Sequence, residues 1–350
     1  MMLESPPEAP PDSEASLDKY LSRPTVETVR SLADLDGDVL ILGAGGKLGL
    51  SLAQMARRAL DQTGRTDLRV IAVSRFGSAA SLARFRTAGL DTMSCDLLAE
   101  GALASLPEAP NVVYLVGMKF GSTSDPGLTW AMNTFLPGLV AGRFKHSRIV
   151  ALSTGNVYPL VDIRSGGALE SDPPGPVGEY AQSCLGRERM FTYYSERERT
   201  QVALVRLNYA NALRYGVLVD IALRVVRGEP VDVTMSHVNV IWQADANDVI
   251  LRSFELCSSP PTVLNVSGPE TASVRWLAIR LAELLSAPFP TFTGEPSETA
   301  LLSNCAKQFA LFGYPTVPLG RLLEWTAAWI RQGGPLLNKP TGFQSRDGTF

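Results

Sequence analysis

Short apolar runs alternate with amphipathic segments over most of the chain. Each run is closed by glycine or a polar residue, which is typical of a buried parallel strand. Strands are predicted at residues 38–42, 69–73, 111–116, 148–153 and 201–207. Helical spacing of apolar residues predicts helices between them, at 48–60, 78–88 and 180–199. This β-α-β-α order indicates an α/β fold, a doubly wound parallel sheet with helices on both faces.

The alternation loosens after Asn208. Further helices are predicted at 217–227, 274–285 and 319–331, and short strands at 231–233, 238–241 and 263–266. We therefore expect this part to form a smaller lobe that is interleaved with the end of the larger unit. The larger domain is expected at 36–208, continued by about 230–266, and a smaller C-terminal substrate-binding lobe at 209–229 and 267–332.

The two ends of the chain have a different composition. Residues 1–18 contain few large apolar side chains and many Pro, Glu and Ser, which predicts a disordered leader. Gly, Pro, Ser and Asn dominate residues 333–350, which predicts a flexible tail.

Charge and composition narrow the classes of function. The 350 residues include 32 Lys and Arg against 35 Asp and Glu, for a net charge of −3 without a long basic block, so no nucleic-acid partner is expected. Four cysteines without a CxxC pair and two histidines predict neither a metal site nor a disulfide. No apolar stretch approaches the roughly 20 residues that cross a bilayer. The first residues also lack the apolar run of a signal peptide. These features predict a cytoplasmic protein with no membrane partner.

A glycine-rich loop follows the first predicted strand. Gly43, Gly46 and Gly49 form a G-x-x-G-x-x-G pattern that encloses Lys47 and Leu48. The first glycine permits a tight turn, the second lets the backbone approach a pyrophosphate, and the third lets the following helix pack closely. The start of that helix supplies unpaired N–H groups for phosphates. Because the loop joins a strand to a helix, it predicts a Rossmann-type dinucleotide site that includes Lys47 and Leu48.

The residue after the second strand bears on which dinucleotide binds. A carboxylate there would bind the ribose 2′-hydroxyl of NAD, whereas arginine can pair with the 2′-phosphate of NADP. This chain has Arg75 at that position, and Asp67 lies before the strand. We therefore expect NADP, with NAD as the alternative.

Several short segments follow the glycine loop in a familiar order: Cys95-Asp96-Leu97, Val113-Tyr114-Leu115-Val116-Gly117, Asn133, Ser153-Thr154-Gly155-Asn156-Val157-Tyr158 and Leu264-Asn265-Val266-Ser267-Gly268-Pro269. In these segments the chain resembles the extended short-chain dehydrogenase/reductase family, the NAD(P)-dependent epimerases and dehydratases. The likeness runs from about Asp38 to Ile330. It implies that Asp96 and Leu97 lie beside the adenine and Val116 beside the nicotinamide half. It also implies a small-molecule substrate such as a sugar, and a homodimer.

The catalytic helix of that family carries Tyr-x-x-x-Lys. The resemblance implies that Tyr180 is the catalytic acid/base and touches the cofactor, with Thr154 as its catalytic polar partner. The family's lysine binds the nicotinamide ribose and lowers the tyrosine pKa, but here that position holds Cys184. Tyrosine ordinarily titrates near ~10, and a neutral thiol cannot lower that value. Arg187 on the same helix and Lys119 after the strand at 111–116 are the candidate replacement cations.

Cys184 itself has two interpretations. A nucleophilic cysteine needs a neighbouring base or a helix N-terminus to form its thiolate. Cys184 is predicted inside a helix with neither histidine nearby, so we expect it to fill the space of the missing lysine.

The substrate side departs from the family as well. Nucleotide-sugar enzymes of the family usually have an asparagine after the strand at 201–207, where this chain has Tyr209. The candidate substrate-binding residues are Lys119, Asn208, Tyr209 and His237. Two functions remain open: hydride transfer on a sugar or related polyol or carbonyl compound, as in an epimerase, dehydratase or reductase, and dinucleotide binding without redox turnover, as in a sensor or partner-binding protein.

Overall fold

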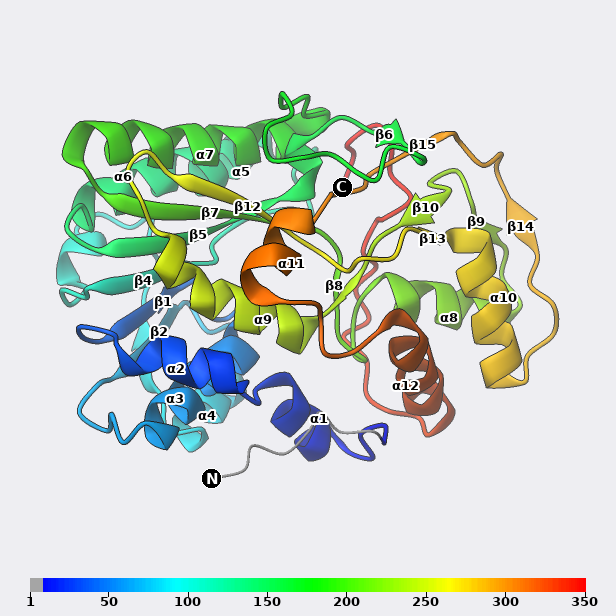
Figure 1. Ribbon diagram of the computed structural model, residues 1–350, viewed down its shortest axis with the longest axis horizontal. Coiled ribbons are helices and arrows are strands. Elements are labelled where there is room, and N and C mark those ends of the chain that lie inside the picture. The colour runs from blue at the N-terminus through cyan, green and yellow to red at the C-terminus, as the bar shows by residue number, and fades with distance from the viewer. Residues whose placement is uncertain (1–8) are drawn as a thin grey trace.

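A seven-stranded parallel sheet forms the centre of the larger domain in the computed structural model, which describes residues 9–350 (Figure 1). Its strand order is β12-β7-β5-β4-β1-β2-β3. The strands are β1 (Val39–Leu42), β2 (Val70–Ser74), β3 (Asp91–Ser94), β4 (Asn111–Tyr114), β5 (Arg148–Thr154), β7 (Gln201–Leu207) and β12 (Thr262–Val266). The chain runs outward from β1 through β2 to β3, then returns to start the other half at β4. The predicted doubly wound sheet is confirmed, and its topological switch point lies between β1 and β4.

Helices cover both faces of this sheet because alternate strand residues point to opposite sides. Val39 and Ile41 of β1 belong to one apolar cluster, and Leu40 and Leu42 to the other. The first cluster includes α3 (Gly49–Gln62) and α9 (Gln243–Arg252), with α2 (Val26–Ala33) packed on both. The second includes α6 (Leu136–Arg143) and α7 (Gly178–Glu198), which lie above the sheet in Figure 1. The other elements of this part are α4 (Ala79–Thr87), α5 (Pro126–Trp130) and the short turns η1 (Leu103–Ser105), η2 (Ala131–Phe135), η3 (Gly155–Val157) and η4 (Ser253–Leu256).

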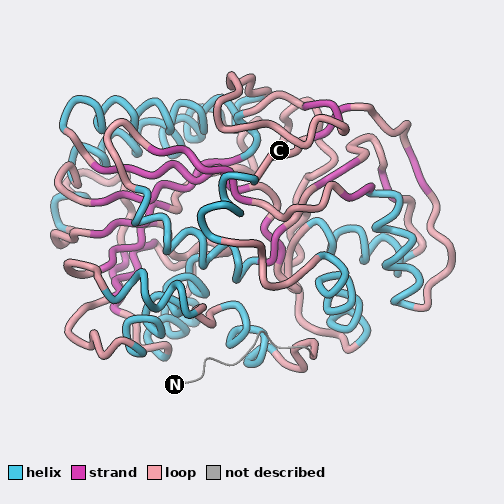
Figure 2. The backbone as a smooth tube through the Cα atoms, viewed as in Figure 1, coloured by secondary structure: helices cyan, strands magenta, loops and turns pink. Residues whose placement is uncertain are grey.

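The smaller lobe contains α8 (Val217–Arg227), α10 (Val274–Leu285) and α12 (Leu319–Arg331), with α11 (Ala306–Phe312) between it and the sheet. Two-residue strands pair across it, seen as short magenta segments in Figure 2: β8 (Ala210–Asn211) with β11 (Ile241–Trp242), β9 (Val231–Asp232) with β14 (Phe292–Thr293), β10 (His237–Val238) with β13 (Ala272–Ser273), and β6 (Val161–Asp162) with β15 (Thr299–Ala300). Its core contains Trp325 and Trp329 and continues into the apolar cluster under the sheet. Among residues 9–350, no helix is both long enough and apolar enough to cross a membrane.

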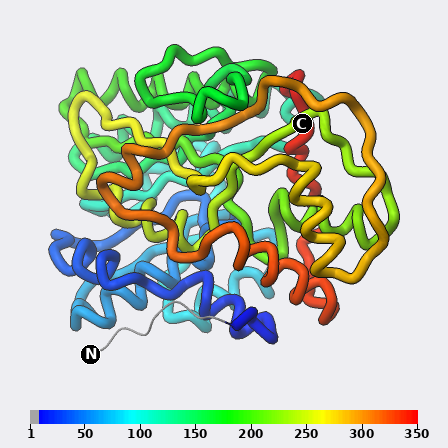
Figure 3. Tube along the Cα trace, turned by 45° about the vertical axis from the view of Figure 1, so that its right-hand side comes forward, coloured from blue at the N-terminus to red at the C-terminus, as the bar shows by residue number. Residues whose placement is uncertain are grey.

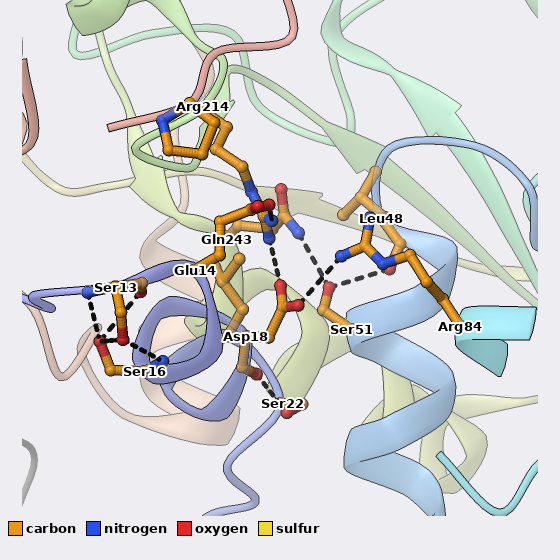
Figure 4. Close-up of polar contacts among 12 residues, drawn as sticks. Ser13, Glu14, Ser16, Asp18, Ser22, Leu48, Ser51, Arg84, Arg214 and Gln243 are labelled. Carbon is orange, nitrogen blue, oxygen red and sulfur yellow. Dashed lines mark hydrogen bonds and ion pairs between the residues drawn. The ribbon is translucent and has the colours of Figure 1, made fainter. Parts of the chain in front are cut away.

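The N-terminal segment differs from the disordered leader that its composition predicts. Helix α1 (Glu14–Leu21) begins with a capping box between Ser13 and Ser16, and it buries Leu17 and Leu21. The carboxylate of Asp18 binds Arg84 of α4 and also Arg214 (Figure 4). The expectation therefore fails for residues 9–18, because two leucines one turn apart give this short helix an apolar side to bury. Residues 1–8 lie outside the described part of the chain.

The C-terminal segment also differs from expectation. Residues 333–350, expected to form a flexible tail, leave α12 and run along the seam between the sheet and the lobe, seen as the red tube in Figure 3. Phe343 is only 5% exposed, and Thr341 is bonded to the Asp220 carboxylate. Composition alone gave no indication of these contacts, because they join residues far apart in the sequence.

Candidate functional site

The glycine loop joins β1 to α3 at the switch point of the sheet. Gly43 has a φ of +83°, and a Cβ there would lie 2.8 Å from the backbone nitrogen of Val116. A Cβ on Gly49 would lie 2.0 Å from the carbonyl oxygen of Ala44. Both positions thus require glycine for the turn itself and for close packing of the helix.

Gly46 is different because the protein leaves space beside it. A Cβ there would meet only the Gly43 carbonyl oxygen, at 3.4 Å. The fold therefore does not demand glycine at this exposed position. A ligand whose phosphate approaches the backbone would demand it.

A cavity of about 390 Å³ opens beside this loop at the carboxyl ends of the strands. Six residues that the sequence singled out for the cofactor line it: Gly43, Gly46, Arg75, Asp96, Leu97 and Val116. Lys47 lines an adjoining cavity, while Leu48 and Gly49 begin α3. The glycine edge and the space beside Gly46 suit a diphosphate, so the site fits a dinucleotide.

The ribose end of the cavity carries Arg75. This side chain is exposed and follows directly after β2. Asp67 pairs with Arg65 before the strand begins, so it does not supply the carboxylate that NAD would use. The carboxylate of Asp96, on the next strand connection, accepts the backbone N–H of Leu98 at 3.1 Å. Arg75 is therefore the one cation among the described residues that line this cavity.

Thr154 and Tyr180 come together from different elements. Thr154 ends β5, and its hydroxyl oxygen accepts the backbone N–H of Asn156 at 3.2 Å. Tyr180 lies in the first turn of α7 and is half-buried. Burial raises the pKa of Tyr180, and the neighbouring Cys184 acts in the same direction. Arg187 and a hydrogen bond with Thr154 act against that rise without cancelling it, so Tyr180 is protonated at neutral pH.

Cys184 lies one turn after Tyr180 and is fully buried. It packs against Val157, Tyr158 and Ala168. Burial raises the pKa of its thiol. Cys184 is thus a neutral space-filling side chain at neutral pH, without the charge that a lysine would bring to Tyr180.

Arg187 is held behind the site. Its guanidinium donates to the Leu152 carbonyl oxygen at 2.7 Å and to Asn133 Oδ1 at 3.0 Å. Asn133 also exchanges two 2.8 Å hydrogen bonds with the backbone of Met118, so it ties the loop after β4 to α7. It sits in a π-helical turn, a distortion often found at functional sites. Arg187 supports the backbone around the site while its charge is engaged there.

Lys119, in the loop after β4, lies close to Tyr180. Its ammonium lies 5.8 Å from the centre of the Tyr180 ring and donates to the Thr341 carbonyl oxygen at 3.0 Å. Burial lowers the pKa of Lys119 to about 8. Burial also lowers the pKa of Lys47 to about 8, and the charges of Lys119 and Lys339 add to that effect. Of the two candidate replacement cations, Lys119 is the one whose ammonium lies over the Tyr180 ring.

The other candidate substrate-binding residues, Asn208, Tyr209 and His237, have different surroundings in the structure. Asn208 is buried and donates to Asn239 Oδ1 at 3.1 Å and to the Leu301 carbonyl oxygen at 3.3 Å. His237 lies in β10, and its ring nitrogen contacts Ser236. The hydroxyl of Tyr209 reaches the C-terminal segment, where it donates to the carbonyl oxygen of Phe343 at 3.4 Å.

Two residues at the site were missed by the sequence reading. The ring centres of Phe350 and Tyr180 lie 5.6 Å apart. The carbonyl oxygen of Thr341 accepts a hydrogen bond from the Lys119 ammonium. The only signal was two phenylalanines, Phe343 and Phe350, in a segment otherwise poor in apolar residues.

A glycine cradle at the switch point and a tyrosine helix beside it define a Rossmann-type dinucleotide protein of the short-chain dehydrogenase/reductase kind. The family model for the NAD dependent epimerase/dehydratase family matches residues 39–216, just over half of the chain, and the chain belongs to this family. No curated protein matches it.

Solved structures share its fold. UDP-glucose 4-epimerase of Thermotoga maritima, solved with UDP-glucose, is 16% identical with a TM-score of 0.70 over 85% of this chain and 99% of its own. MoeE5, solved with UDP-glucose and NAD, is 20% identical with a TM-score of 0.68 over 85% and 99%. UDP-glucuronic acid 4-epimerase of Bacillus cereus, solved with UDP-glucuronic acid and NAD, is 19% identical with a TM-score of 0.68 over 84% and 99%. Each is covered almost completely, whereas this chain has segments without a counterpart in them.

Proposed function

We propose that this protein binds NADP(H), or NAD(H), in the cavity beside the glycine loop and reduces a carbonyl group of a sugar or related polyol compound. The observation that carries the proposal is that Thr154 and Tyr180, from different elements, meet through a hydrogen bond, with the Lys119 ammonium 5.8 Å from the centre of the Tyr180 ring. The protonated phenol of Tyr180 can donate a proton to a carbonyl oxygen, with the hydroxyl of Thr154 beside it.

The cavity supports the cofactor part of the proposal. Gly46 leaves a space that a diphosphate would fill, and Arg75 offers a cation to a 2′-phosphate. The cavity reaches Gly117, from which the chain leads through Met118 to Lys119 beside Tyr180. A dinucleotide laid from Arg75 across the glycine loop would therefore extend toward Tyr180.

When bound, the reduced nicotinamide would supply the hydride. Tyr180 would donate its phenolic proton to the carbonyl oxygen of the substrate, and the hydroxyl of Thr154 would donate a hydrogen bond to the same oxygen. The product is an alcohol and leaves Tyr180 as a phenolate. The ammonium of Lys119, 5.8 Å from the ring centre, would stabilise that negative charge in place of the missing lysine.

A second candidate function is dinucleotide binding without turnover, and the neutral, buried Cys184 favours it. A short-chain dehydrogenase site that lacks its lysine loses both a ribose contact and a charge beside the tyrosine. In that case the chain would act as a dinucleotide-dependent sensor or as a partner-binding protein.

Titration and turnover measurements separate the two candidates. NADPH and NADH are titrated against the protein by nicotinamide fluorescence, and oxidation of the bound cofactor is followed at its absorbance band with a panel of keto sugars and aldoses. Binding with oxidation on at least one compound is expected. Binding without oxidation on the whole panel would establish the second candidate, and failure of both dinucleotides to bind would remove both.

A further inference from the structure

Residues 341–350, called the strap, pack against Tyr180 on one side and against the lobe on the other. In Figures 1 and 3 the red segment rises from α12 between the sheet and the lobe and ends beside the upper part of the seam. The contacts of the strap determine how much space remains beside Tyr180.

The strap is fastened to the lobe at three points. The backbone N–H and the hydroxyl of Thr341 both donate to the Asp220 carboxylate at 2.7 Å. The carbonyl of Phe343 accepts the Tyr209 hydroxyl, and its ring is buried. The guanidinium of Arg346 donates to both the carbonyl and the hydroxyl oxygen of Thr299 at 2.7 Å. These contacts come from separate elements, and each of them adds to the attachment.

The strap also interlocks with the start of α7. Gly348 has a φ of +75°, and a Cβ on it would lie 2.1 Å from the Val177 carbonyl oxygen. Gly178 faces it with a φ of +81°, and a Cβ there would lie 2.4 Å from the Gly348 carbonyl oxygen. Two glycines in left-handed conformations thus let the two backbones touch. On the same side, the N–H of Gly121 donates to the Phe350 carbonyl oxygen at 3.1 Å.

Phe350 contacts the candidate catalytic residues directly. Its ring lies 5.6 Å from the Tyr180 ring at 82°, an edge-to-face contact that leaves no room between the rings. The Lys119 ammonium lies 4.1 Å from the centre of the Phe350 ring and also binds the Thr341 carbonyl. The strap therefore covers one side of Tyr180 and holds Lys119 in position.

The dinucleotide cavity is left uncovered. None of the residues that line it belongs to the strap. A dinucleotide could enter without moving the strap, whereas a large group attached to the substrate would meet it on the lobe side. The cleft thus has one open half and one covered half.

We propose that the strap is a fixed wall of the substrate cleft and that Phe350 is a specificity-determining residue, which admits compact carbonyl compounds and excludes sugars linked to a nucleotide. This inference rests on the proposed function, because it takes Tyr180 as the residue that the substrate must reach. It differs from what the solved relatives bind, since those were crystallised with UDP-sugars.

The fixed attachment is tested by hydrogen exchange on the full chain. Arg346→Gln removes the bonds to Thr299, and Arg331→Gln, at an exposed position of α12, is the matched control. Exchange should rise about tenfold in Arg346→Gln, in peptides covering the strap and in the peptide containing Gly121, since about 1.4 kcal/mol of attachment is lost. The control should not change. An unchanged Gly121 peptide in Arg346→Gln would contradict the attachment.

The exclusion is tested by calorimetry with UDP-glucose as the probe. The wild-type protein should show no binding at millimolar probe, while Phe350→Ala and a chain ended after Leu337 should gain it. Binding of UDP-glucose by the wild-type protein would overturn the proposal. If hydrogen exchange in the strap also rose when UDP-glucose was added, the strap would be a movable gate and not a fixed wall. Failure of both variants to gain binding would equally contradict the wall. Neither experiment measures turnover or NADPH binding. Failure of this proposal can therefore be distinguished from failure of the proposed function.

Discussion

The two halves of the cleft are built on different principles. The dinucleotide half is open, is lined by the glycine loop and the ends of neighbouring strands, and has a glycine whose missing side chain the protein does not fill. The Tyr180 half is packed by an aromatic ring, a buried thiol and a strap from the far end of the chain. An open half made from one loop is suited to a ligand common to many proteins. A covered half assembled from distant segments is where this chain sets its own specificity.

The halves also differ in their electrostatics. The dinucleotide half presents one exposed cation, Arg75, at its ribose end. The Tyr180 half contains Lys119, whose pKa burial lowers to about 8, and Tyr180, whose pKa burial raises. Burial in this half therefore favours the neutral form of both groups.

Removing the hydroxyl of Tyr180 should have the largest effect. Tyr180→Phe is expected to lower carbonyl reduction roughly 10²–10⁴-fold, because the proton donor is lost, while dinucleotide affinity stays nearly constant. Steady-state rates and a fluorescence titration check both parts. Tyr193→Phe, on the exposed side of the same helix, is the control. Equal losses of rate and of dinucleotide affinity would show that the halves are not separable.

Filling the glycine cradle should affect only the open half. Gly46→Val is expected to weaken NADPH binding about 100-fold, or roughly 3 kcal/mol, because the side chain takes the place of the diphosphate. The melting temperature should change little, since a Cβ there meets only an ordinary contact. Gly320→Val in α12, where a Cβ would have open space, is the control. An unchanged NADPH affinity in Gly46→Val would contradict binding of the diphosphate beside Gly46.

Lys119 should give stability a particular pH dependence. Its folded pKa of about 8 lies below the ordinary 10.5, so the unfolded chain holds the proton more strongly. The buried ammonium therefore destabilises the fold below pH 8, and this cost fades as the pH rises toward 10.5. With allowance for partial exposure, the gap in unfolding free energy between wild type and Lys119→Met should change by on the order of 2 kcal/mol between pH 7 and 10. Denaturant unfolding measures it, with exposed Lys145→Met as the control; a constant gap would argue against a buried ammonium.

The smallest expected effect concerns the choice of dinucleotide. Arg75→Ala should reduce affinity for NADPH about tenfold and leave NADH nearly unchanged, because a single exposed arginine–phosphate pair is worth on the order of 1.4 kcal/mol. Paired fluorescence titrations measure the ratio. If both affinities fell equally, Arg75 would not discriminate between the two dinucleotides.

The open half could be predicted from the sequence because its parts are local. The glycine loop, the strand before it and the helix after it lie within one short stretch, and six of the proposed cofactor residues line one cavity. Helices with a clear apolar side, at 217–227 and 274–285, have the bounds that their spacing predicted.

The covered half could not be predicted because its contacts join remote segments. Lys119 meets Thr341, and Tyr180 meets Phe350, in pairs that no short pattern links. The burial of helix α9 on all sides was not apparent from its sequence, because its polar Asn247 and Asp245 bond to other elements in the interior. Helix α1 was missed because the proline-rich residues before it dominated the composition of its segment.

The most direct measurement is thiol labelling resolved by cysteine, with and without NADPH. Cys95 lines the dinucleotide cavity and is partly exposed, Cys184 is buried beside Tyr180, and Cys257 lies outside the cavity. We predict that saturating NADPH protects Cys95, leaves the labelling rate of Cys257 unchanged, and leaves Cys184 unlabelled throughout. Equal labelling of Cys95 with and without either dinucleotide would contradict an open dinucleotide half beside a covered active site.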